Sequence, residues 1–372
     1  GNKPIVEHLI AEMSSAGIKE FILVVGYHAE TIRQHFGNGE RSGVKIEYVT
    51  QRKQLGTAHA LSTVEGLVGD RFLLANGDVL IKSSDIERIS SANETTLGLF
   101  EVEDARSFGA VELEGDRVAR IHEKVENPPS NLANAGLYLL TGDIFPALNR
   151  TKKSPRGEYE LTDSLQLMMN EGYVVKGSGI DNWLDLSYPW DLLSANEALL
   201  PLLEEFNQGT VEQNVVIKGK VSIGKGTVIR SNCYLVGPMI IGDNCDIGPN
   251  CYIRPSTTIG DNCHIGSAVE VKNSIIMRGS KAPHHNYVGD SIIGEDCNLG
   301  AGTKVANLRL DKKNIVVSGV DTRRHKLGAI IGDGVQTGIN ASINVGSLIG
   351  DGSYIGPGAV ASGVILPNSR IT

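Results

Sequence analysis

The side chains best suited to chemistry in this chain lie in a short polar stretch of its second half, from Gly279 to Asp290. The stretch contains His284 and Tyr287, and it is followed by Asn307 and by Lys312-Lys313. An imidazole can take up a proton near neutral pH, and amide, hydroxyl and ammonium groups can hold an anion. A lone histidine is most often structural, but this combination predicts an anion-binding cleft in which His284 is the base.

A second set of candidate residues lies in the first half, where a strand pattern ends in a polar turn. The apolar run Arg71–Ala75 predicts a buried strand, and Asn76-Gly77-Asp78 follows it directly. Ligands of open α/β sheets bind beyond the carboxyl ends of the strands. Asp78 could be a helix cap or a loop residue, but its carboxylate at such an edge suits a Mg²⁺ ion that also holds a phosphate.

An earlier turn of this kind runs from Gln51 to Ala60, after a strand that we expect over residues 45–51. It places Gly56 where a backbone must approach something closely, and it opens a helix whose N-terminus favours anions. A tight strand-to-helix turn without a ligand explains the same residues equally well.

A six-residue repeat predicts the framework that positions the first set of residues. An aliphatic residue or Met occupies every sixth position in the series Val211, Ile217, Ile223, Ile229, Leu235, Ile241, Ile247, Ile253, Ile259, Ile265, Val271, Met277. Gly often follows these positions, as a chain that turns a corner every six residues requires. The repeat predicts a hexapeptide solenoid, which is a parallel β-helix.

The repeat resumes at Ile293, Leu299, Val305, Ile331, Ile343, Ile349 and Ile355. We therefore expect two interruptions: four extra residues between Met277 and Ile293, and a longer excursion from about Asn307 to Gly328. Interruptions of a regular solenoid form loops, and loops often carry sites.

Two cations occupy the position after a core residue that Gly usually fills. Arg254 and Lys272 are eighteen residues apart, which is one coil of the left-handed β-helix that the pattern resembles. We expect them to stack on one outward face, separated by the strand spacing of about 4.8 Å. Two solvated surface charges are the alternative interpretation.

The first half alternates helical and strand patterns up to about residue 200, which predicts a parallel sheet covered by helices. An apolar helical face at residues 5–13 precedes a buried strand at 21–25, and residues 189–207 predict a linking helix. The expected domains are 1–190 (α/β), 191–208 (linker helix) and 209–372 (β-helix).

Composition excludes several classes of protein. The chain has 372 residues and a net charge of −8 without a basic track, which argues against binding to nucleic acid or to a membrane surface. No apolar run approaches the length of about 20 residues that a bilayer requires, and no signal peptide is evident. We therefore expect a cytoplasmic protein.

The five cysteines share one position of the repeat. Each lies four residues after a core aliphatic position, where Val, Thr or Ile stands elsewhere: Cys233, Cys245, Cys251, Cys263, Cys297. A position shared by these residue types points inward, so we expect small buried apolar side chains and neither disulfides nor metal ligands.

Seven short motifs of the first half, taken in order, resemble the sugar-1-phosphate nucleotidylyltransferases. They are Gln51-x5-Thr57, Asn76-Gly77-Asp78, Phe108-Gly109, Glu123-Lys124, Asn134-x-Gly136, Glu160-Leu161-Thr162-Asp163 and Trp183-x-Asp185. The resemblance covers nearly all of residues 1–200 and implies a Rossmann-like nucleotidyltransferase fold. In that family one Mg²⁺ joins the nucleoside triphosphate to the attacking sugar phosphate.

The resemblance also implies a role for each matching residue. It makes Gln51, Gly56 and Thr57 nucleobase contacts, Asp78 and Asp185 the metal pair, and Gly109, Glu123, Lys124, Asn134 and Glu160 sugar-phosphate contacts. The family opens with a strand, a Gly-x-Gly-Thr-Arg loop and a Pro-Lys pair that cradle and activate the triphosphate. This sequence begins after that point, so we expect nucleotidyl transfer from the intact protein and little from a chain without the loop.

Motifs of the second half resemble the acetyltransferase half of bifunctional N-acetylglucosamine-1-phosphate uridylyltransferases. They are Tyr252-Ile253-Arg254-Pro255, Glu270-Val271-Lys272-Asn273, the stretch from Gly279 to Asp290, Asn298 to Thr303, and Asn307. The residues after Asn307 are Leu-Arg-Leu-Asp where bacterial members have Tyr-Asp-Gly, and the pattern is closer to that of archaeal members.

This second resemblance implies an acetyl-transfer site. It makes His284 the general base and Ala301 the backbone contact to the acetyl-CoA thioester. It makes Arg254, Lys272, Tyr287 and Lys313 the residues that hold the sugar phosphate, and Asn298 and Asn307 those that orient the amino sugar.

Together the two resemblances imply a homotrimeric bifunctional enzyme. It would acetylate glucosamine-1-phosphate or galactosamine-1-phosphate and transfer a nucleotide from UTP or dTTP to a hexose or hexosamine 1-phosphate. Two alternatives stay open: a monofunctional nucleotidylyltransferase with a structural β-helix, and a non-catalytic scaffold like the subunits of a translation-initiation exchange factor. The set of His284, Tyr287 and Asn307 favours the bifunctional enzyme, because neither alternative needs it.

Overall fold

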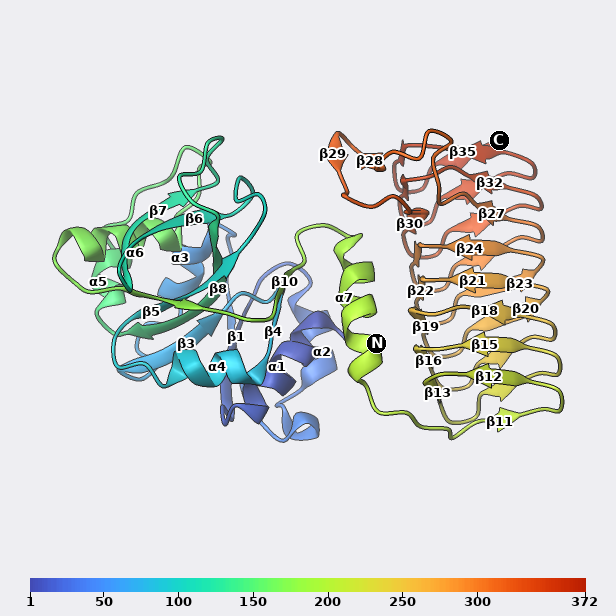
Figure 1. Cartoon of the computed structure of the whole chain (residues 1–372), viewed down its shortest axis with the longest axis horizontal. Coiled ribbons are helices and arrows are strands. Elements are labelled where there is room, and N and C mark those ends of the chain that lie inside the picture. Colours follow the sequence, from blue (N-terminus) through green and yellow to red (C-terminus); the bar gives the residue numbers. More distant parts are fainter. The chain divides into compact units, whose positions relative to one another are not determined.

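The computed structural model describes residues 1–372, which fold into two compact units (Figure 1). One unit is Pro4–Asp185, and the other is Leu186–Thr372 together with Gly1–Lys3. The predicted domain limits stay a prediction, but the compact units place the linker-helix residues with the β-helix. None of the helices combines the length and the apolar character needed to cross a bilayer.

The first unit is built from short strands and helices that alternate along most of its length (Figure 1). The strands are β1 (Glu20–Val25), β2 (Lys45–Thr50), β3 (Arg71–Ala75), β4 (Val79–Ile81), β5 (Thr96–Glu101), β6 (Gly109–Glu114), β7 (Arg117–Glu123), β8 (Leu132–Thr141), β9 (Lys176–Gly179) and β10 (Trp183–Asp185). The helices are α1 (Ile5–Ser15), α2 (Ala29–Phe36), α3 (Thr57–Ser62), α4 (Ser83–Ser90), α5 (Ile144–Leu148) and α6 (Leu161–Asn170).

The strands form one mixed sheet and two separate pairs. The six-stranded sheet has the order β3-β8-β5-β9-β7-β6, whereas β1 pairs with β2 and β10 pairs with β4. The predicted α/β class is confirmed, but a wholly parallel sheet is wrong, because the β3–β8, β5–β8 and β6–β7 pairs are antiparallel. The connection from Glu114 to Arg117 is too short for parallel neighbours, which need a crossover of a dozen or more residues.

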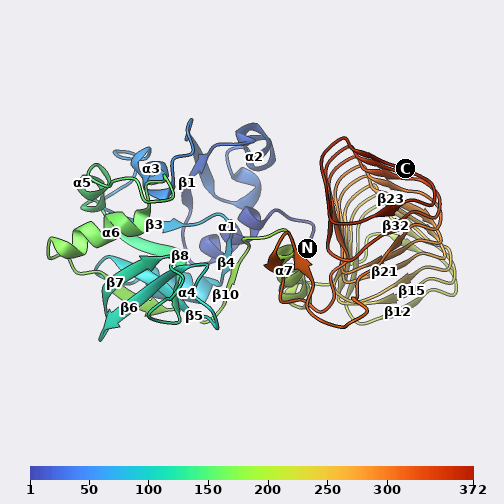
Figure 2. The ribbon, with the colours of Figure 1, turned by 90° about the horizontal axis from the view of Figure 1, so that it is seen from above.

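Strand β8 separates the two main apolar cores of this unit. Its Leu137 and Leu139 pack with α1 and α4, whereas its Tyr138 and Leu140 pack with α3, α5 and α6. Successive side chains of a strand point to opposite faces, so this one strand supports helices on both faces of the sheet (Figure 2).

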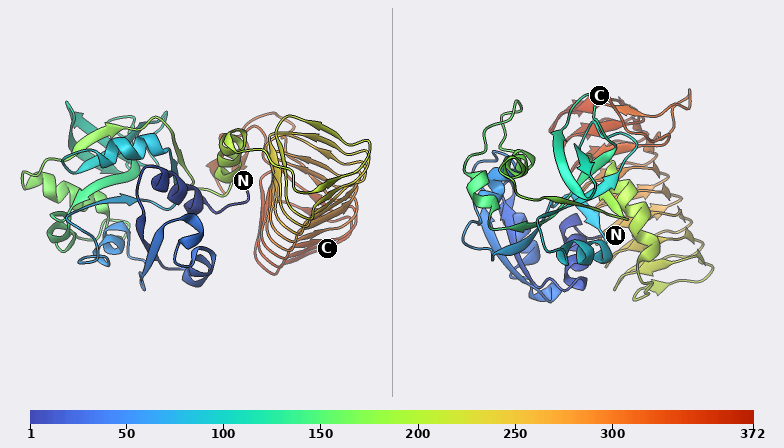
Figure 3. Two further views of the ribbon diagram at one scale, coloured as in Figure 1. Left: turned by 90° about the horizontal axis from the view of Figure 1, so that it is seen from below. Right: turned by 60° about the vertical axis from the view of Figure 1, so that its left-hand side comes forward.

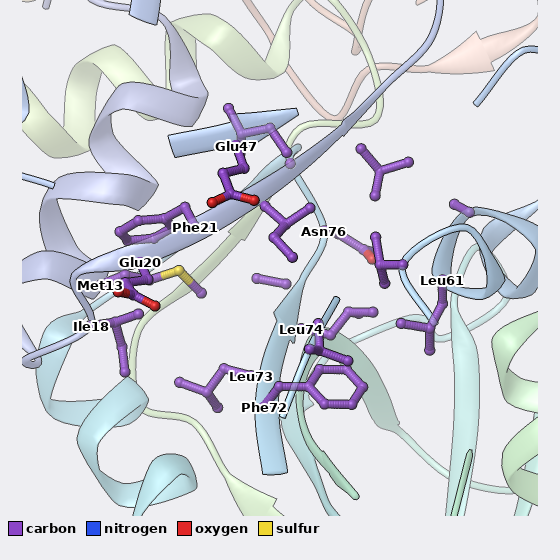
Figure 4. A pocket seen from close by; sticks show the side chains of 18 of the residues that line it. Met13, Ile18, Glu20, Phe21, Glu47, Leu61, Phe72, Leu73, Leu74 and Asn76 are labelled. Carbon is purple, nitrogen blue, oxygen red and sulfur yellow. The ribbon is translucent and has the colours of Figure 1, made fainter. Parts of the chain in front are cut away.

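An apolar cavity of about 840 Å³ lies between β1 and β3. Every residue of both strands lines it, and Figure 4 shows Phe21, Phe72 and Leu61 around the space. Because β1 is hydrogen-bonded only to β2 and β3 only to β8, one edge of each strand has no strand partner. The β1–β2 pair is therefore not hydrogen-bonded to the six-stranded sheet.

The second unit is a parallel β-helix with three faces, and the predicted left-handed β-helix class is confirmed. Face 1 consists of β11 (Thr210–Val211), β14 (Val228–Ile229), β17 (Asp246–Ile247), β20 (His264–Ser267), β23 (Lys281–His284), β26 (Asn298–Leu299), β31 (Gln336–Thr337), β34 (Tyr354–Ile355) and β37 (Arg370–Ile371). Face 2 consists of β12 (Val216–Lys218), β15 (Tyr234–Val236), β18 (Tyr252–Ile253), β21 (Glu270–Lys272), β24 (Tyr287–Gly289), β27 (Lys304–Val305), β32 (Ser342–Ile343) and β35 (Val360–Ala361). Face 3 consists of β13 (Val221–Ile223), β16 (Met239–Ile241), β19 (Thr257–Ile259), β22 (Ile275–Ile276), β25 (Ile292–Ile293), β30 (Ala329–Ile331), β33 (Ser347–Ile349) and β36 (Val364–Ile365).

The six-residue register is confirmed up to Val271 and needs a correction directly after it. Ile276, and not Met277, continues the inward series, because Ile259 pairs with Ile276 one coil later. This coil is therefore one residue shorter than the eighteen predicted. Met277 is apolar for another reason: it packs against the cluster formed around helix α7.

The expected four extra residues before Ile293 are also wrong. Ala282 and Val288 fill the two intervening core positions, and both are buried. Val288 to Ile293 is again a step of five residues. A small side chain such as Ala282 does not stand out as a core position in the sequence, which is why the register was lost there.

All five cysteines are free and buried within the core of the β-helix, as their position in the repeat predicted.

Helix α7 (Asp191–Leu199) begins the second unit and is shorter than the predicted 189–207. A 3-10 turn, Leu200–Leu202, follows it, and Leu203 is already extended. Pro201 within this turn lacks the N–H that a continuing α-helix would use. Trp190 and Leu193 pack with Ile292 of face 3, so this end of the helix lies against the β-helix.

The excursion predicted from about residue 307 to 328 is confirmed between β27 and β30. It contains a hairpin, β28 (Val316–Val317) and β29 (Val320–Asp321), which projects from the coils (Figure 3). Ile315, Val317 and Leu327 join the cluster of α7, so the excursion and the helix cover part of face 3 together.

Candidate active sites

His284 and Ala301 lie at the same corner of the β-helix, on neighbouring coils. His284 ends strand β23, and its carbonyl accepts the N–H of Gly302 at 3.0 Å, directly after Ala301. His284 is exposed, and the N–H of Ala301 makes no hydrogen bond within the chain. The backbones of His284 and Ala301 are therefore neighbours on successive coils, about one strand spacing or roughly 4.8 Å apart, and the corner carries both an exposed imidazole and an unpaired donor.

Tyr287, Arg254 and Lys272 lie on face 2, which the chain enters after this corner. Ile253 pairs with Val271, so Arg254 and Lys272 hold the same position on successive coils, and their predicted stacking is confirmed. Lys272 in turn pairs with Gly289 at the end of the strand that Tyr287 begins. The base and the two cations are thus at opposite ends of one short face.

Both cations are paired with carboxylates, which the sequence analysis missed. Arg254 Nη1 is 3.0 Å from Glu270 Oε1, and Lys272 Nζ is 2.9 and 2.8 Å from the two carboxylate oxygens of Asp290. The hydrogen bond to Glu270 raises the pKa of Arg254. Glu270 and Asp290 both belong to the motifs that carry the resemblance. No feature of the sequence singled them out as site residues, because a carboxylate does not itself bind an anion.

Asn307 returns to this face from the start of the excursion. Its Nδ2 donates to the Tyr287 hydroxyl at 3.2 Å and to Asp290 Oδ2 at 2.5 Å. A Cβ on Gly289 would lie 2.6 Å from Asn307 Nδ2 and 2.7 Å from Tyr287 Oη, so only Gly leaves room for this pair. Burial raises the pKa of the Tyr287 hydroxyl, which therefore stays a neutral donor.

Two of the predicted residues lie apart from this set. Asn298 is on face 1, where it pairs with Lys281 and with Gln336. Lys313 is exposed in the excursion, and its backbone N–H donates to Asp311. Neither side chain forms a hydrogen bond or ion pair with the residues of face 2.

Gln51, Gly56 and Thr57 lie together at the start of α3 in the first unit. Gln51 Nε2 donates to the Gly56 carbonyl at 3.2 Å, and Thr57 Oγ1 accepts the N–H of Leu161 at 3.0 Å. Gly56 has a φ of +108°, and a Cβ there would lie 2.5 Å from the carbonyl oxygen of Tyr159. The close approach that Gly56 permits is therefore to this backbone, which ties the turn to the segment before α6.

Gly109, Glu123 and Asn134 are brought together from β6, β7 and β8. Gly109 pairs with Glu123, and a Cβ on Gly109 would lie 3.0 Å from Glu123 Oε2 and 3.5 Å from Asn134 Cβ. Asn134 Nδ2 donates to the Tyr138 hydroxyl at 2.7 Å. Lys124 follows directly, exposed and with a positive φ of 48°. The predicted sugar-phosphate contacts thus share one end of these strands.

Arg156 joins Glu160 to this group and was not predicted as a site residue. Glu160 is buried, and Arg156 Nη1 lies 3.4 Å from its Oε1 and 3.8 Å from Glu123 Oε1. Burial raises the pKa of Glu123, and the charge of Arg156 opposes this effect. The signal in the sequence was a single basic residue four positions before Glu160.

Asp78 and Asp185 come from segments far apart in the sequence and meet at one strand pair. Asp185 of β10 pairs with Val79 of β4, and Asp78 directly precedes Val79 and is exposed. No cluster of three or more His, Cys, Asp or Glu residues could hold a metal ion alone. Two neighbouring carboxylates suit Mg²⁺, which takes one or two protein carboxylates and completes its shell with water and phosphate oxygens.

Comparisons with known proteins give a match for each half of the chain. Residues 1–201 match the nucleotidyl transferase family, and residues 235–338 match the GMPPB C-terminal domain family. The bifunctional protein GlmU of Methanococcus maripaludis strain C7 is 46% identical and matches over 99% of this chain and 90% of its own length. The GlmU of Methanocaldococcus jannaschii is 39% identical over 95% of this chain and 86% of its own length.

A third relative carries both activities in its name. The bifunctional sugar-1-phosphate nucleotidylyltransferase/acetyltransferase of Sulfurisphaera tokodaii is 39% identical over 97% of this chain and 90% of its own length. The fold and these matches define a nucleotidyltransferase domain joined to a β-helix. The chain belongs to the family of bifunctional sugar-1-phosphate nucleotidylyltransferase/acetyltransferases.

The contact between Arg156 and Glu123 predicts how this carboxylate titrates. With its pKa raised by burial, Glu123 stabilises the fold most below its unfolded pKa of about 4.3, and this contribution is lost as the pH rises through the folded pKa. Arg156→Gln should raise the pKa of Glu123 further, because it removes a cation that favours the carboxylate. Side-chain carboxyl NMR titration measures the shift.

The matched control for this titration is Arg117→Gln, which changes an arginine at the opposite end of β7. It should leave the pKa of Glu123 unchanged. An unchanged or lowered pKa in Arg156→Gln would mean that the two side chains do not interact in solution.

Proposed function

We propose that the chain is a bifunctional enzyme of amino-sugar nucleotide synthesis that works in the cytoplasm as a homotrimer. One site transfers an acetyl group from acetyl-CoA to glucosamine-1-phosphate or galactosamine-1-phosphate. The other joins a hexose or N-acetylhexosamine 1-phosphate to a nucleoside triphosphate such as UTP or dTTP and releases pyrophosphate. One observation supports the proposed acetyl transfer above all: at one corner of the β-helix, the exposed imidazole of His284 lies one coil from the unpaired N–H of Ala301.

Acetyl transfer to an amine needs a base and an oxyanion donor. The hexosamine reaches the enzyme as an ammonium, so His284 removes one proton before the nitrogen attacks the thioester carbonyl carbon. The C–S bond breaks as the tetrahedral intermediate collapses, and CoA leaves as a thiolate. The nitrogen gives up a second proton as it becomes an amide, the thiolate takes up one proton, and the other passes to solvent. The Ala301 N–H, which has no acceptor within the chain, donates to the intermediate oxyanion. Lys272 and Tyr287 hold the phosphate at the other end of face 2.

Nucleotidyl transfer is an in-line attack by a sugar-phosphate oxygen on the α-phosphorus of the triphosphate. Glu123 and Asn134 orient the sugar from the strand ends that hold them together. Asp78 and Asp185 are the residues that would hold Mg²⁺, which neutralises phosphate charge when it is bound. Gln51, Gly56 and Thr57 contact the nucleobase in this proposal, and Lys124 is an exposed cation for the sugar phosphate.

The family model that matches residues 235–338 is named only as a C-terminal domain and does not mention acetyl transfer, so a nucleotidylyltransferase whose β-helix is structural is the alternative proposal. The two proposals differ in whether any acetyl group is transferred. An acetyl-CoA assay with both hexosamine 1-phosphates distinguishes them.

The trimer prediction concerns the surface of face 2. This face exposes Val216, Tyr252 and Val360, and its site is open at the His284 corner. A threefold interface would cover these side chains and let a neighbour complete the site. Sedimentation velocity at micromolar concentration should give a trimer mass, and a monomer would contradict the proposal.

For the nucleotidyl site, Asp78→Asn and Asp185→Asn should each abolish Mg²⁺-dependent transfer and leave acetyl transfer unchanged. Each change removes one of two carboxylates from the metal site. Pyrophosphate release in the presence of Mg²⁺, a nucleoside triphosphate and a hexose 1-phosphate tests this. Undiminished release in either variant would refute the metal assignment.

For the acetyl site, His284→Ala should lower acetyl transfer by roughly 10²–10⁴-fold, the usual contribution of a general base. Nucleotidyl transfer and trimer formation should not change. The control is His285→Asn, which alters the adjacent exposed imidazole, and Asn suits the positive φ of 52° at that position. Near-normal acetyl transfer by His284→Ala would remove the base from the proposal.

A further inference from the structure

A single buried carboxylate joins the residues of face 2 to one another. The Asp290 side chain is only 3% exposed, yet three side chains donate hydrogen bonds to it. The donors are Lys272 Nζ to both oxygens at 2.9 and 2.8 Å, Asn273 Nδ2 to Oδ1 at 2.9 Å, and Asn307 Nδ2 to Oδ2 at 2.5 Å. Every oxygen of this buried charge therefore has at least two donors, as a buried carboxylate requires.

The backbone of Asp290 also closes the excursion. Its carbonyl accepts the N–H of Gly328 at 2.8 Å, and the carbonyl of Asn307 accepts the N–H of Leu327 at 3.1 Å. The residue where the excursion begins and the residue where it ends are thus both tied to Asp290, one by the side chain and one by the main chain. The position of Asn307 depends on both ties.

The network continues from Asp290 to helix α7. Asn273 Nδ2 donates to Glu197 Oε1 at 2.7 Å as well as to Asp290. The same Glu197 oxygen accepts Arg324 Nη2, and Arg324 Nη1 donates to Ser194 Oγ at 2.9 Å. The excursion is therefore attached at its base by Asp290 and farther along by Arg324.

The β-helix itself does not need this carboxylate. Asp290 has a positive φ of 48°, a corner conformation that Asn or Asp adopts at many coils. Asp296 has the same conformation, with a φ of 52°, at a corner in the same part of the β-helix, and it is exposed. The corner geometry thus accounts for the residue type at both positions, but not for a buried Asp290 with its ion pair.

We propose that Asp290 is the positioning residue of the acetyl-acceptor site, a role that rests on the proposed acetyl transfer. It fixes the Lys272 ammonium with two of its three N–H groups engaged, which leaves one donor in a defined direction for the phosphate. It also fixes the Asn307 amide, whose Nδ2 reaches the Tyr287 hydroxyl. Asp290 itself does not contact the substrate, since its oxygens are occupied by these donors.

The test is Asp290→Asn, with acetyl transfer measured at varied glucosamine-1-phosphate. The amide replaces one acceptor oxygen with an N–H₂ group that faces other donors, so Lys272 and Asn307 should both lose their positions. We expect KM and the calorimetric Kd for glucosamine-1-phosphate to rise about tenfold or more, while kcat changes less than about threefold, because His284 and Ala301 lie outside the network.

The matched control is Asp296→Asn, which should leave KM, Kd and kcat unchanged. A double variant gives a second readout: Asn307→Ala should raise KM in the wild-type background and add little to Asp290→Asn, since both act through the same contact. Additive effects, or a fall in kcat with KM unchanged, would overturn the positioning role.

The outcomes separate this inference from the function on which it rests. If the wild type transfers acetyl groups and Asp290→Asn keeps a normal KM, Asp290 does not position the site, and the proposed function stands. If the wild type neither transfers acetyl groups nor binds glucosamine-1-phosphate, both proposals fail. If it binds without transfer, the proposed function fails, and the change in Kd decides the role of Asp290.

Discussion

Parallel stacking of coils is the constraint on which the proposed acetyl site depends. Each strand pairs with the strand one coil later, so equivalent positions recur directly above one another at about 4.8 Å. This ladder places Arg254 next to Lys272 and the Ala301 corner next to His284, although eighteen and seventeen residues separate the members of these pairs. A chain with so short a repeat builds a site by varying a few outward positions, while the inward positions keep the core closed.

The repeat explains which parts of this half could be predicted. Inward positions carry large aliphatic residues often enough to give the register, the fold class and the stacking of the two cations. The register failed where Ala282 took a core position and Met277 was apolar on account of α7. A one-residue shortening of a coil leaves no signal when a small side chain follows it. The ion pair of Lys272 with Asp290 could not be predicted from the sequence either, because it joins the end of one strand to a corner of the next coil.

The first half was less predictable, because its contacts do not repeat. Strands β1 and β3 could be predicted from local runs of apolar residues, and the turns after them from the Gly residues that follow. The antiparallel partners of β8, and the pairing that brings Asp185 beside Asp78, arise from strands distant in sequence. The resemblance supplied these residues as a pair, whereas the residues alone placed only Asp78 at a sheet edge. Gly56 is a further example. The sequence predicted that a backbone approaches something closely there, but it could not show that the neighbour is the backbone of Tyr159.

In each candidate site a cation is held by carboxylates of the same chain. Arg254 pairs with Glu270, Lys272 with Asp290, and Arg156 lies beside Glu123 and Glu160. A carboxylate partner cancels most of the long-range attraction between the cation and a phosphate. It also fixes the direction of the N–H donors of the cation that the carboxylate does not use. Recognition by oriented donors suits an enzyme with a net charge of −8, which has no basic surface to collect anions indiscriminately. A paired cation also costs less to bury than a free one, which allows Lys272 to lie partly inside face 2 where a free ammonium would be expelled.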